Sequence, residues 1–192
     1  MLDANARAIL GELDDSAVVV DVGGWAQPFT RADYVVDLMP YETRGVFGRI
    51  GDGDERFTKD RWLQLDVCSS PLPFADHSVD YLVCSHTLED IRDPIHLCRE
   101  INRVAKRGYL EVPSRQMESI LGLEAPGYPG YYHHRWLVEV EGNALLFRFK
   151  TPLMRRAPQM SIHRRPIRSA RVVIKSDITV SPSSVRLSRT PT

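Results

Sequence analysis

The sequence predicts a three-layer α/β domain with a mostly parallel sheet and an antiparallel hairpin near its C-terminal end. Short runs of β-branched and other apolar residues, typical of strands buried on both faces, recur along the chain. They are separated by segments with helical spacing or loop composition, and strands that alternate with helices form parallel sheets. A chain of 192 residues is long enough for one well-buried domain and too short for two comfortable ones.

The N-terminal elements follow from apolar spacing. Apolar residues at helical intervals predict an amphipathic helix over 3–13. Residues 17–22 form a mostly β-branched run and predict a central strand. Residues 34–37 repeat this pattern and predict a second short strand.

The middle of the chain predicts two more strands and a well-marked helix. Strands are expected at 62–66 and 79–84. Asp93 is placed to cap a helix and Pro94 fits its first turn, where a missing N–H donor has no cost. Gly108 is predicted to end this helix.

The last predicted elements are β-strands. Residues 109–112 predict a fifth parallel strand. The segments 135–140 and 144–150 flank a Glu-Gly-Asn turn and predict an antiparallel hairpin at the edge of the sheet.

Three of the predicted strands end at or next to an aspartate: Asp21, Asp37 and Asp66. Ligands of parallel sheets bind at the carboxyl ends of the strands. Carboxylates there could accept hydrogen bonds from the hydroxyl and amino groups of a nucleoside. One such aspartate alone is better explained as the start of a turn, but three at successive strand ends favour a ligand site.

The segment 72–90 resembles part of a known family. It opens with a leucine-proline-phenylalanine turn, continues through the predicted fourth strand and ends in a stretch with a leucine and an acid. Residues 99–104, followed by 106–108, are similar to the family's helix and turn before strand five. In this order and spacing the motifs resemble the class I S-adenosylmethionine-dependent methyltransferases, of the type 11 methyltransferase domain group, over about residues 15–115. The resemblance implies a Rossmann-like three-layer sandwich and S-adenosyl-L-methionine as cofactor.

The resemblance also implies roles around the cofactor's methionine end. Gly23 and Gly24 would let the backbone approach it, and Asp21 would lie near its ammonium group. Ser85 and His86 would line the cleft beside the reactive methyl group. His86 is a candidate general base, and local hydrogen bonding in a loop is the alternative.

For the nucleoside end, the resemblance implies that Asp37 accepts hydrogen bonds from the ribose hydroxyls. Asp66 would bind the adenine amino group, and Val67 would pack near the ring. The sequence departs from the family at residues 25–33, because nine residues that include a proline cannot hold a long helix between the first two strands.

Residues 131–136, Tyr-Tyr-His-His-Arg-Trp, are the most unusual segment outside the core. They predict either part of an acceptor pocket, which is slightly favoured, or an aromatic cover over the sheet edge. On a strand, His133 and His134 would point to opposite faces, so no metal site is predicted.

The composition suggests a cytoplasmic protein. The N-terminus has neither the basic start nor the apolar stretch of a signal peptide, and no apolar run is long enough to span a bilayer. Three cysteines without a C-x-x-C pair argue against a disulfide framework or a structural zinc site. They are expected to be small core residues.

A methyltransferase-like domain is predicted over 1–150 and a basic tail, disordered or poorly packed, over 151–192. The tail holds eight arginines and Lys175 against the single Asp177, a net charge of +8. Such a tail could bind RNA, could simply be solvated, or could be foreign to the family. It lacks aromatic residues for stacking, so nucleic acid is not favoured as a partner.

The predicted function is methyl transfer from S-adenosyl-L-methionine to an unidentified acceptor, which could be a small molecule or a saccharide-type compound. No membrane partner is expected, and the oligomeric state does not follow from the sequence. One alternative is a catalytically inactive binding protein that kept the fold. A nicotinamide-dependent oxidoreductase is less favoured, because the loop after the first strand has no G-x-G-x-x-G motif.

Overall fold

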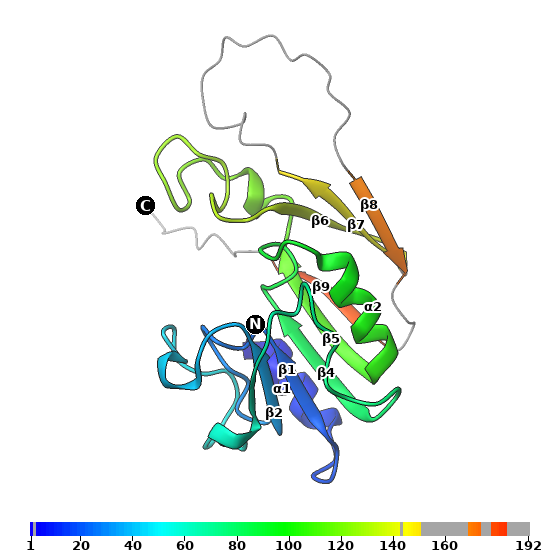
Figure 1. Ribbon diagram of the computed structural model, residues 1–192. Coiled ribbons are helices and arrows are strands. Elements are labelled where there is room, and N and C mark those ends of the chain that lie inside the picture. Colours follow the sequence, from blue (N-terminus) through cyan, green and yellow to red (C-terminus); the bar gives the residue numbers. More distant parts are fainter. Residues whose placement is uncertain (2, 143, 151–168, 174–177, 184–192) are drawn as a thin grey trace.

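The computed structural model describes residues 1, 3–142, 144–150, 169–173 and 178–183. A parallel six-stranded sheet forms its centre, and a three-stranded antiparallel sheet lies beside it (Figure 1). This architecture confirms the predicted Rossmann-like α/β fold. In the part of the chain that the structure describes, no helix has the length and apolarity needed to cross a membrane.

The central sheet has the strand order β3-β2-β1-β4-β5-β9. In chain order its strands are β1 (Val19–Val22), β2 (Tyr34–Asp37), β3 (Trp62–Gln64), β4 (Val79–Ser85), β5 (Ala105–Pro113) and β9 (Ile178–Ser183). The chain runs outward from β1 through β2 to β3, and then returns to the other side of β1 as β4. The order therefore reverses between β1 and β4, and in open α/β sheets ligands bind at the carboxyl ends of the strands at such a point.

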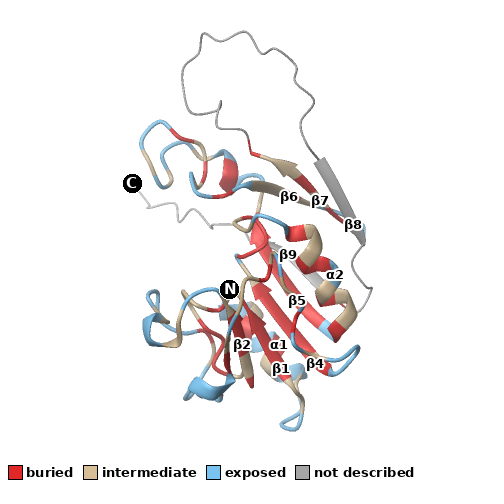
Figure 2. Ribbon diagram, viewed as in Figure 1, coloured by how far each residue is buried: buried red, intermediate tan, exposed pale blue. Residues whose placement is uncertain are grey.

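Within the described residues, one α-helix covers each face of the sheet. The helix α1 (Asp3–Glu12) packs through Ala6 and Ile9 on one set of alternating strand residues: Val19, Val35, Tyr81, Val83 and Tyr109. The helix α2 (Pro94–Val104) packs on the other set: Val20, Val22, Val36, Leu82, Cys84 and Leu110. Alternate residues of a strand point to opposite faces, so the β-branched runs supply both cores. Figure 2 shows the resulting buried centre.

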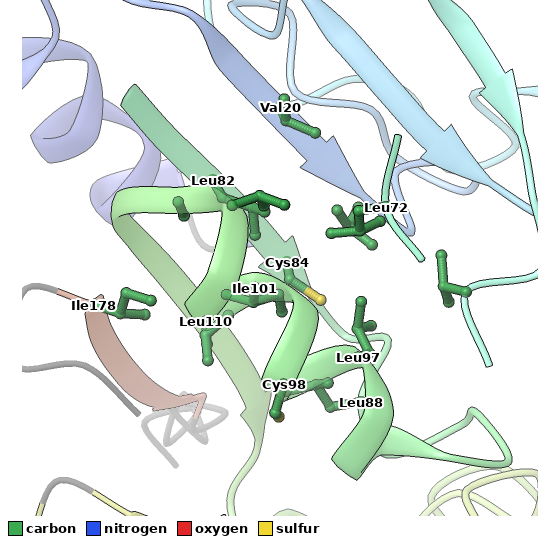
Figure 3. Packing of buried hydrophobic residues seen from close by; sticks show 14 of the residues in the cluster. Val20, Leu72, Leu82, Cys84, Leu88, Leu97, Cys98, Ile101, Leu110 and Ile178 are labelled. Carbon is green, nitrogen blue, oxygen red and sulfur yellow. The ribbon is translucent and has the colours of Figure 1, made fainter. Parts of the chain in front are cut away.

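The core on the α2 side is built mainly from aliphatic side chains, together with two thiols. Figure 3 shows Leu97, Cys98 and Ile101 of α2 facing Leu82 and Cys84 of β4. Cys84 and Cys98 are buried and free, as expected of small core residues.

The start of α2 matches the prediction, but its end does not. The Asp93 carboxylate accepts a hydrogen bond from the His96 backbone N–H at 3.0 Å, and Pro94 lies in the first turn. The helix ends at Val104, and β5 begins at once. Gly108 lies inside β5, where an added Cβ would be 2.6 Å from the carbonyl oxygen of Leu82. The glycine thus permits close strand approach rather than ending the helix, and the predicted role was wrong.

The predicted hairpin is present, but not at the edge of the central sheet. The strands β6 (Trp136–Glu141) and β7 (Ala144–Phe149) pair antiparallel, and β8 (Ser169–Val173) adds to β7. The edge beside β5 is occupied by β9. The hairpin instead contributes Val138, Leu145 and Phe147 to the core around α2.

Two segments of the predicted tail are therefore strands. The strand β9 is a sixth parallel strand where five were expected, and β8 includes Val172 and Val173, which the sequence suggested as an edge strand. The predicted tail's other residues lie outside the described residues. The division at residue 150 stays a prediction.

The connections at the carboxyl ends of the first strands contain no long helix. Residues 23–33, between β1 and β2, hold only turns and bends, as the short predicted crossover requires. In the part of the chain that the structure describes, the other helical turns are the short 3₁₀ segments η1 (Tyr41–Thr43), η2 (Lys59–Arg61) and η3 (Met117–Ser119).

Candidate functional site

A cavity of about 610 Å³ opens at the carboxyl ends of β1 and β4. Its walls come from the loop after β1, the loop after β4 and the segment 131–134 that precedes β6. Its lining includes Asp21, Gly23, Gly24, Trp25, Ser85, His86, Thr87, Asp90, Glu124, Tyr131, His133 and His134. The volume is in the range of small-molecule sites, and the cavity lies at the reversal of strand order where ligands of such sheets bind.

The loop after β1 turns at two glycines that contact the protein itself. Gly23 has a φ of +81°, and an added Cβ would lie 1.9 Å from Oγ1 of Thr87. A Cβ on Gly24 would lie 2.2 Å from Oδ2 of Asp21. A side chain at Gly23 would be strained by its φ as well as by this approach, and one at Gly24 would require Asp21 to shift. The structure thus gives a reason for the glycines that differs from the expected approach of a ligand.

Asp21 is a buried carboxyl group under this loop. It is 3% exposed, and its Oδ2 accepts a hydrogen bond from the Phe29 backbone N–H at 2.9 Å. Burial raises the pKa of Asp21 to about 7, against the lowering effect of this hydrogen bond, and the nearby charge of Asp37 raises it further. Near neutral pH the group is therefore divided between its neutral and charged forms, and a nearby cation would favour the charged form.

Asp37 ends β2 and ties two loops together. Its Oδ2 accepts from the Trp25 backbone N–H at 3.0 Å, and its Oδ1 accepts from the Met39 backbone N–H at 2.9 Å. Burial raises its pKa in spite of these hydrogen bonds. Asp37 does not line the cavity itself but fixes Trp25, which does.

Asp66 and Val67 lie apart from the cavity. The Asp66 carboxylate accepts hydrogen bonds from the Cys68 backbone N–H and the Ser69 hydroxyl, both at 2.9 Å. These bonds, the first above all, lower its pKa. This is the turn-starting arrangement that the sequence left open as an alternative. Val67 is buried in the core around α2. The structure thus brings Asp21, Gly23, Gly24, Ser85 and His86 together around one cavity and leaves Asp37, Asp66 and Val67 outside its lining.

Ser85, the last residue of β4, carries a hydroxyl oxygen that is buried without a hydrogen-bond partner. Buried polar atoms of native proteins nearly always have a partner, so an orphan in the wall of a cavity points to a ligand. Ser85 lines the cavity, and its role beside a cofactor stays a prediction.

His86 adopts a left-handed conformation, with a φ of +54°. Its Nε2 lies 3.0 Å from Oε1 of Glu111, and its Nδ1 lies 3.2 Å from Oε1 of Glu89. Burial by itself lowers the pKa of His86, but the hydrogen bonds to Glu111 and then Glu89 outweigh it and raise the pKa to about 9. Both ring nitrogens therefore donate to carboxylates, and the ring is an imidazolium at neutral pH.

Glu111 has the opposite balance. Burial raises its pKa, but the hydrogen bonds from His86 and Tyr109 outweigh this and lower it to about 2. A histidine with both nitrogens engaged and a raised pKa is poorly suited to remove a proton from an acceptor. The geometry favours the alternative left open for His86, local hydrogen bonding that holds the loop after β4 against β5.

Sequence reasoning missed the two carboxylates that hold this histidine. Glu89 and Glu111 are both 1% exposed. The available signal was an acid within the apolar run 109–112, since a buried acid must find a partner.

The segment 131–134 forms the opposite wall. It precedes β6, which begins only at Trp136, and is therefore not part of a strand. The centroids of the His133 and His134 rings lie 4.6 Å apart. The prediction that the two histidines point to opposite faces was therefore wrong. Nδ1 of His134 is hydrogen-bonded to the buried Glu118, and Nδ1 of His133 lies 2.8 Å from Oε1 of Glu124.

A buried ion pair supports this wall from behind. The Lys150 ammonium donates to Oε2 of Glu118 at 2.5 Å and to the Tyr131 carbonyl oxygen at 2.7 Å. The side chains of Lys150 and Glu118 are 1% and 3% exposed. Burial raises the pKa of Glu118, but its bonds to His134 and Lys150 outweigh this and lower it.

Comparison with known proteins gives one match. Residues 34–110 match the model of the methyltransferase domain family, from the start of β2 into β5. No curated protein and no solved structure matches the chain significantly. The matched segment contains the leucine-proline-phenylalanine turn, β4 and α2, on which the resemblance was based, and begins after the glycine loop. Residues 34–110 are thus similar to a methyltransferase domain of this family, and the resemblance drawn from the sequence is confirmed over this segment.

Proposed function

We propose that the protein binds S-adenosyl-L-methionine in the 610 Å³ cavity and transfers its methyl group to an acceptor. The observation that carries the proposal is the position of the cavity, at the carboxyl ends of β1 and β4 in a chain whose residues 34–110 are similar to a methyltransferase domain. That edge joins the glycine loop, the partly charged Asp21 and the orphan hydroxyl of Ser85.

These residues fit the methionine end of such a cofactor. Asp21 gains a full negative charge when a cation such as an ammonium or sulfonium group approaches it. The Ser85 hydroxyl gains the hydrogen bond that it lacks. Asp37 lies outside the lining of the cavity and acts on it through Trp25, whose backbone N–H it holds at 3.0 Å.

The cofactor would supply an electrophilic methyl group, and S-adenosylhomocysteine would be released. The chain's own contribution is to hold the acceptor in line with that group and to exclude water. The rigid contacts of His86 with Glu89 and Glu111 serve this positioning, and no proton transfer through His86 is needed for an acceptor that is already nucleophilic.

Calorimetric titration of the full chain with S-adenosylhomocysteine tests the proposal. Ser85→Ala removes only the orphan hydroxyl and should weaken binding by roughly tenfold, about 1.4 kcal/mol. Asp37→Ala should weaken it at least as much, and circular dichroism checks that this variant folds. Asp76→Ala is the matched control, because Asp76 is exposed in the turn before β4, at the other end of that strand. Absence of binding to folded wild-type protein would overturn the proposal.

An inactive binding protein is the second candidate, favoured by one observation. Residues 23–33 lack a helix whose N-terminus could face the cofactor. Binding of S-adenosylhomocysteine without methyl transfer across a panel of small-molecule and saccharide acceptors would select this function. The acceptor class and a cytoplasmic location stay predictions.

A further inference from the structure

Three side chains with potential metal-ligand atoms converge in the lining of the cavity. Oδ2 of Asp90 lies 3.8 Å from Nε2 of His133, and Oδ1 of Asp90 lies 3.8 Å from Nε2 of His134. One ligand atom from each of the three residues falls within a common distance of 4.8 Å. Asp90 comes from the loop after β4 and the histidines from the segment before β6, so only the fold brings them together.

The other nitrogen of each ring is already bonded to a carboxylate. Nδ1 of His134 bonds to Glu118, and Nδ1 of His133 lies 2.8 Å from Glu124. Carboxylates accept hydrogen bonds, so Nδ1 carries the proton in both rings and Nε2 is turned toward Asp90. Metal-binding histidines are oriented in this way, by a carboxylate on the ring nitrogen that does not bind the metal.

The contacts to Asp90 leave its charge incompletely satisfied. A separation of 3.8 Å is too long for a hydrogen bond. Oδ1 of Asp90 is buried and has no hydrogen-bond partner. Ligand atoms around a tetrahedral ion with bonds of about 2.1 Å lie roughly 3.4 Å apart, so binding requires the three side chains to close by up to about 1.4 Å from their present spacing.

We propose that Asp90, His133 and His134 bind a divalent transition-metal ion such as Zn²⁺. Two imidazoles and a carboxylate form a common three-ligand set for such an ion and leave a fourth position open. All three residues line the 610 Å³ cavity, so the open position faces the space proposed for cofactor and acceptor. The metal site goes beyond the proposed function and does not depend on it, because metal binding is measured without cofactor.

The test uses the full chain after treatment with a chelator. Calorimetry with Zn²⁺ should show one tight site per chain, and Co²⁺ should give the visible absorption of a low-symmetry bound ion. Loss of a residue that only hydrogen-bonds a metal ligand typically reduces metal affinity by ~10–100-fold. Asp90→Asn and His133→Ala should each reduce the affinity for Zn²⁺ by more than this. Glu124→Gln changes the partner of His133 but keeps an oxygen that can accept from the Tyr132 backbone N–H, and it should give a loss within that range.

Matched controls separate this site from adventitious binding. His96→Ala removes a histidine whose ring lies against the Ser70 carbonyl, and Asp76→Asn alters an exposed acid paired with Arg103; both should leave the affinity unchanged. Failure of folded wild-type protein to bind Zn²⁺ or Co²⁺ would overturn the proposal. Equal affinity in wild type, Asp90→Asn and His133→Ala would overturn it too, since binding would then lie elsewhere. Titration with S-adenosylhomocysteine in the absence of metal reports separately on the proposed function.

Discussion

The imidazole of His86 joins two strands of the central sheet: its Nε2 lies 3.0 Å from Oε1 of Glu111, at the carboxyl end of β5, while its backbone continues from β4. The backbone N–H of His86 donates to the Glu111 carbonyl oxygen at 2.8 Å as well. Oε1 of Glu89 accepts a hydrogen bond from the other ring nitrogen, Nδ1. The loop that forms one wall of the cavity is thus held by a charged histidine between two buried carboxylates.

This arrangement predicts a specific pH dependence of stability. The pKa of His86 is raised from 6.5 to about 9, so its stabilising effect is fully present below pH 6.5 and is lost as the pH rises toward 9. His86→Gln should therefore destabilise the protein at pH 6 more than at pH 9.5. Urea unfolding at both pH values checks this, with His96→Gln as control. Equal destabilisation at both values would show that the ring is not charged in the folded state.

Asp21 should affect stability in the opposite way to His86, because the charged form of Asp21 destabilises the folded protein. Its pKa rises from 3.8 to about 7 because of burial, so its unfavourable effect on folding appears as the pH rises above 3.8 and is complete above 7. Asp21→Asn keeps an oxygen to accept from Phe29 and should stabilise the protein at pH 8 by up to about 4 kcal/mol.

Thermal denaturation at pH 5 and pH 8 measures the effect of Asp21→Asn, and the gain should grow with pH. Asp66→Asn is a useful comparison, because the pKa of Asp66 is lowered and the sign should be opposite. A gain for Asp21→Asn that is independent of pH would refute the raised pKa.

Gly23 should tolerate no side chain. Gly23→Ala places a Cβ 1.9 Å from Oγ1 of Thr87 at a φ of +81°, and we expect a loss of roughly 2–4 kcal/mol together with weakened ligand binding. Gly11→Ala is the control, since Gly11 lies in α1 with nothing within 4 Å of an added Cβ. It should stabilise the protein by about 0.5–1 kcal/mol in the same denaturation experiment. Equal effects of the two substitutions would contradict the close approach to Thr87.

Glu118 and Lys150 should stabilise the folded protein only when both are present, because each compensates the buried charge of the other. Lys150→Met leaves a buried carboxylate with less compensation and should destabilise the protein by about 3–5 kcal/mol in chemical denaturation. Adding Glu118→Gln to Lys150→Met should recover part of this loss, because the uncompensated charge is removed. Lys59→Met is the control: its pair with Glu42 is exposed, and no measurable change is expected. A similar loss in both lysine variants would contradict this account of the buried pair.

Much of the fold could be predicted because it depends on local patterns. The run Tyr34–Asp37 is a strand with the predicted bounds, and the Asp93 cap starts α2 as predicted. A strand that is buried on both faces consists of apolar residues, and a helix cap requires particular residues at the helix start, so both can be read from the local sequence. The similarity of residues 34–110 to the methyltransferase domain family could be recognised from the same kind of local motif.

The site was predicted only in part, because several of its residues are held by hydrogen-bond partners that are far away in the sequence. The glycine loop, Asp21, Ser85 and His86 were found from their positions after predicted strands. The pairing of His86 with Glu111, 25 residues away in the chain, could not be derived from spacing.

Local sequence determined which segments of this chain become strands and helices, and which acids stand at strand ends. Only the tertiary structure decided that Asp66 serves its own turn while Asp21 faces a cavity. Likewise, it decided that His133 and His134 turn toward Asp90 rather than apart. The physical reason is that secondary structure depends on neighbours in sequence, whereas burial, pKa and ligand geometry depend on which charges and donors the fold brings within a few ångströms.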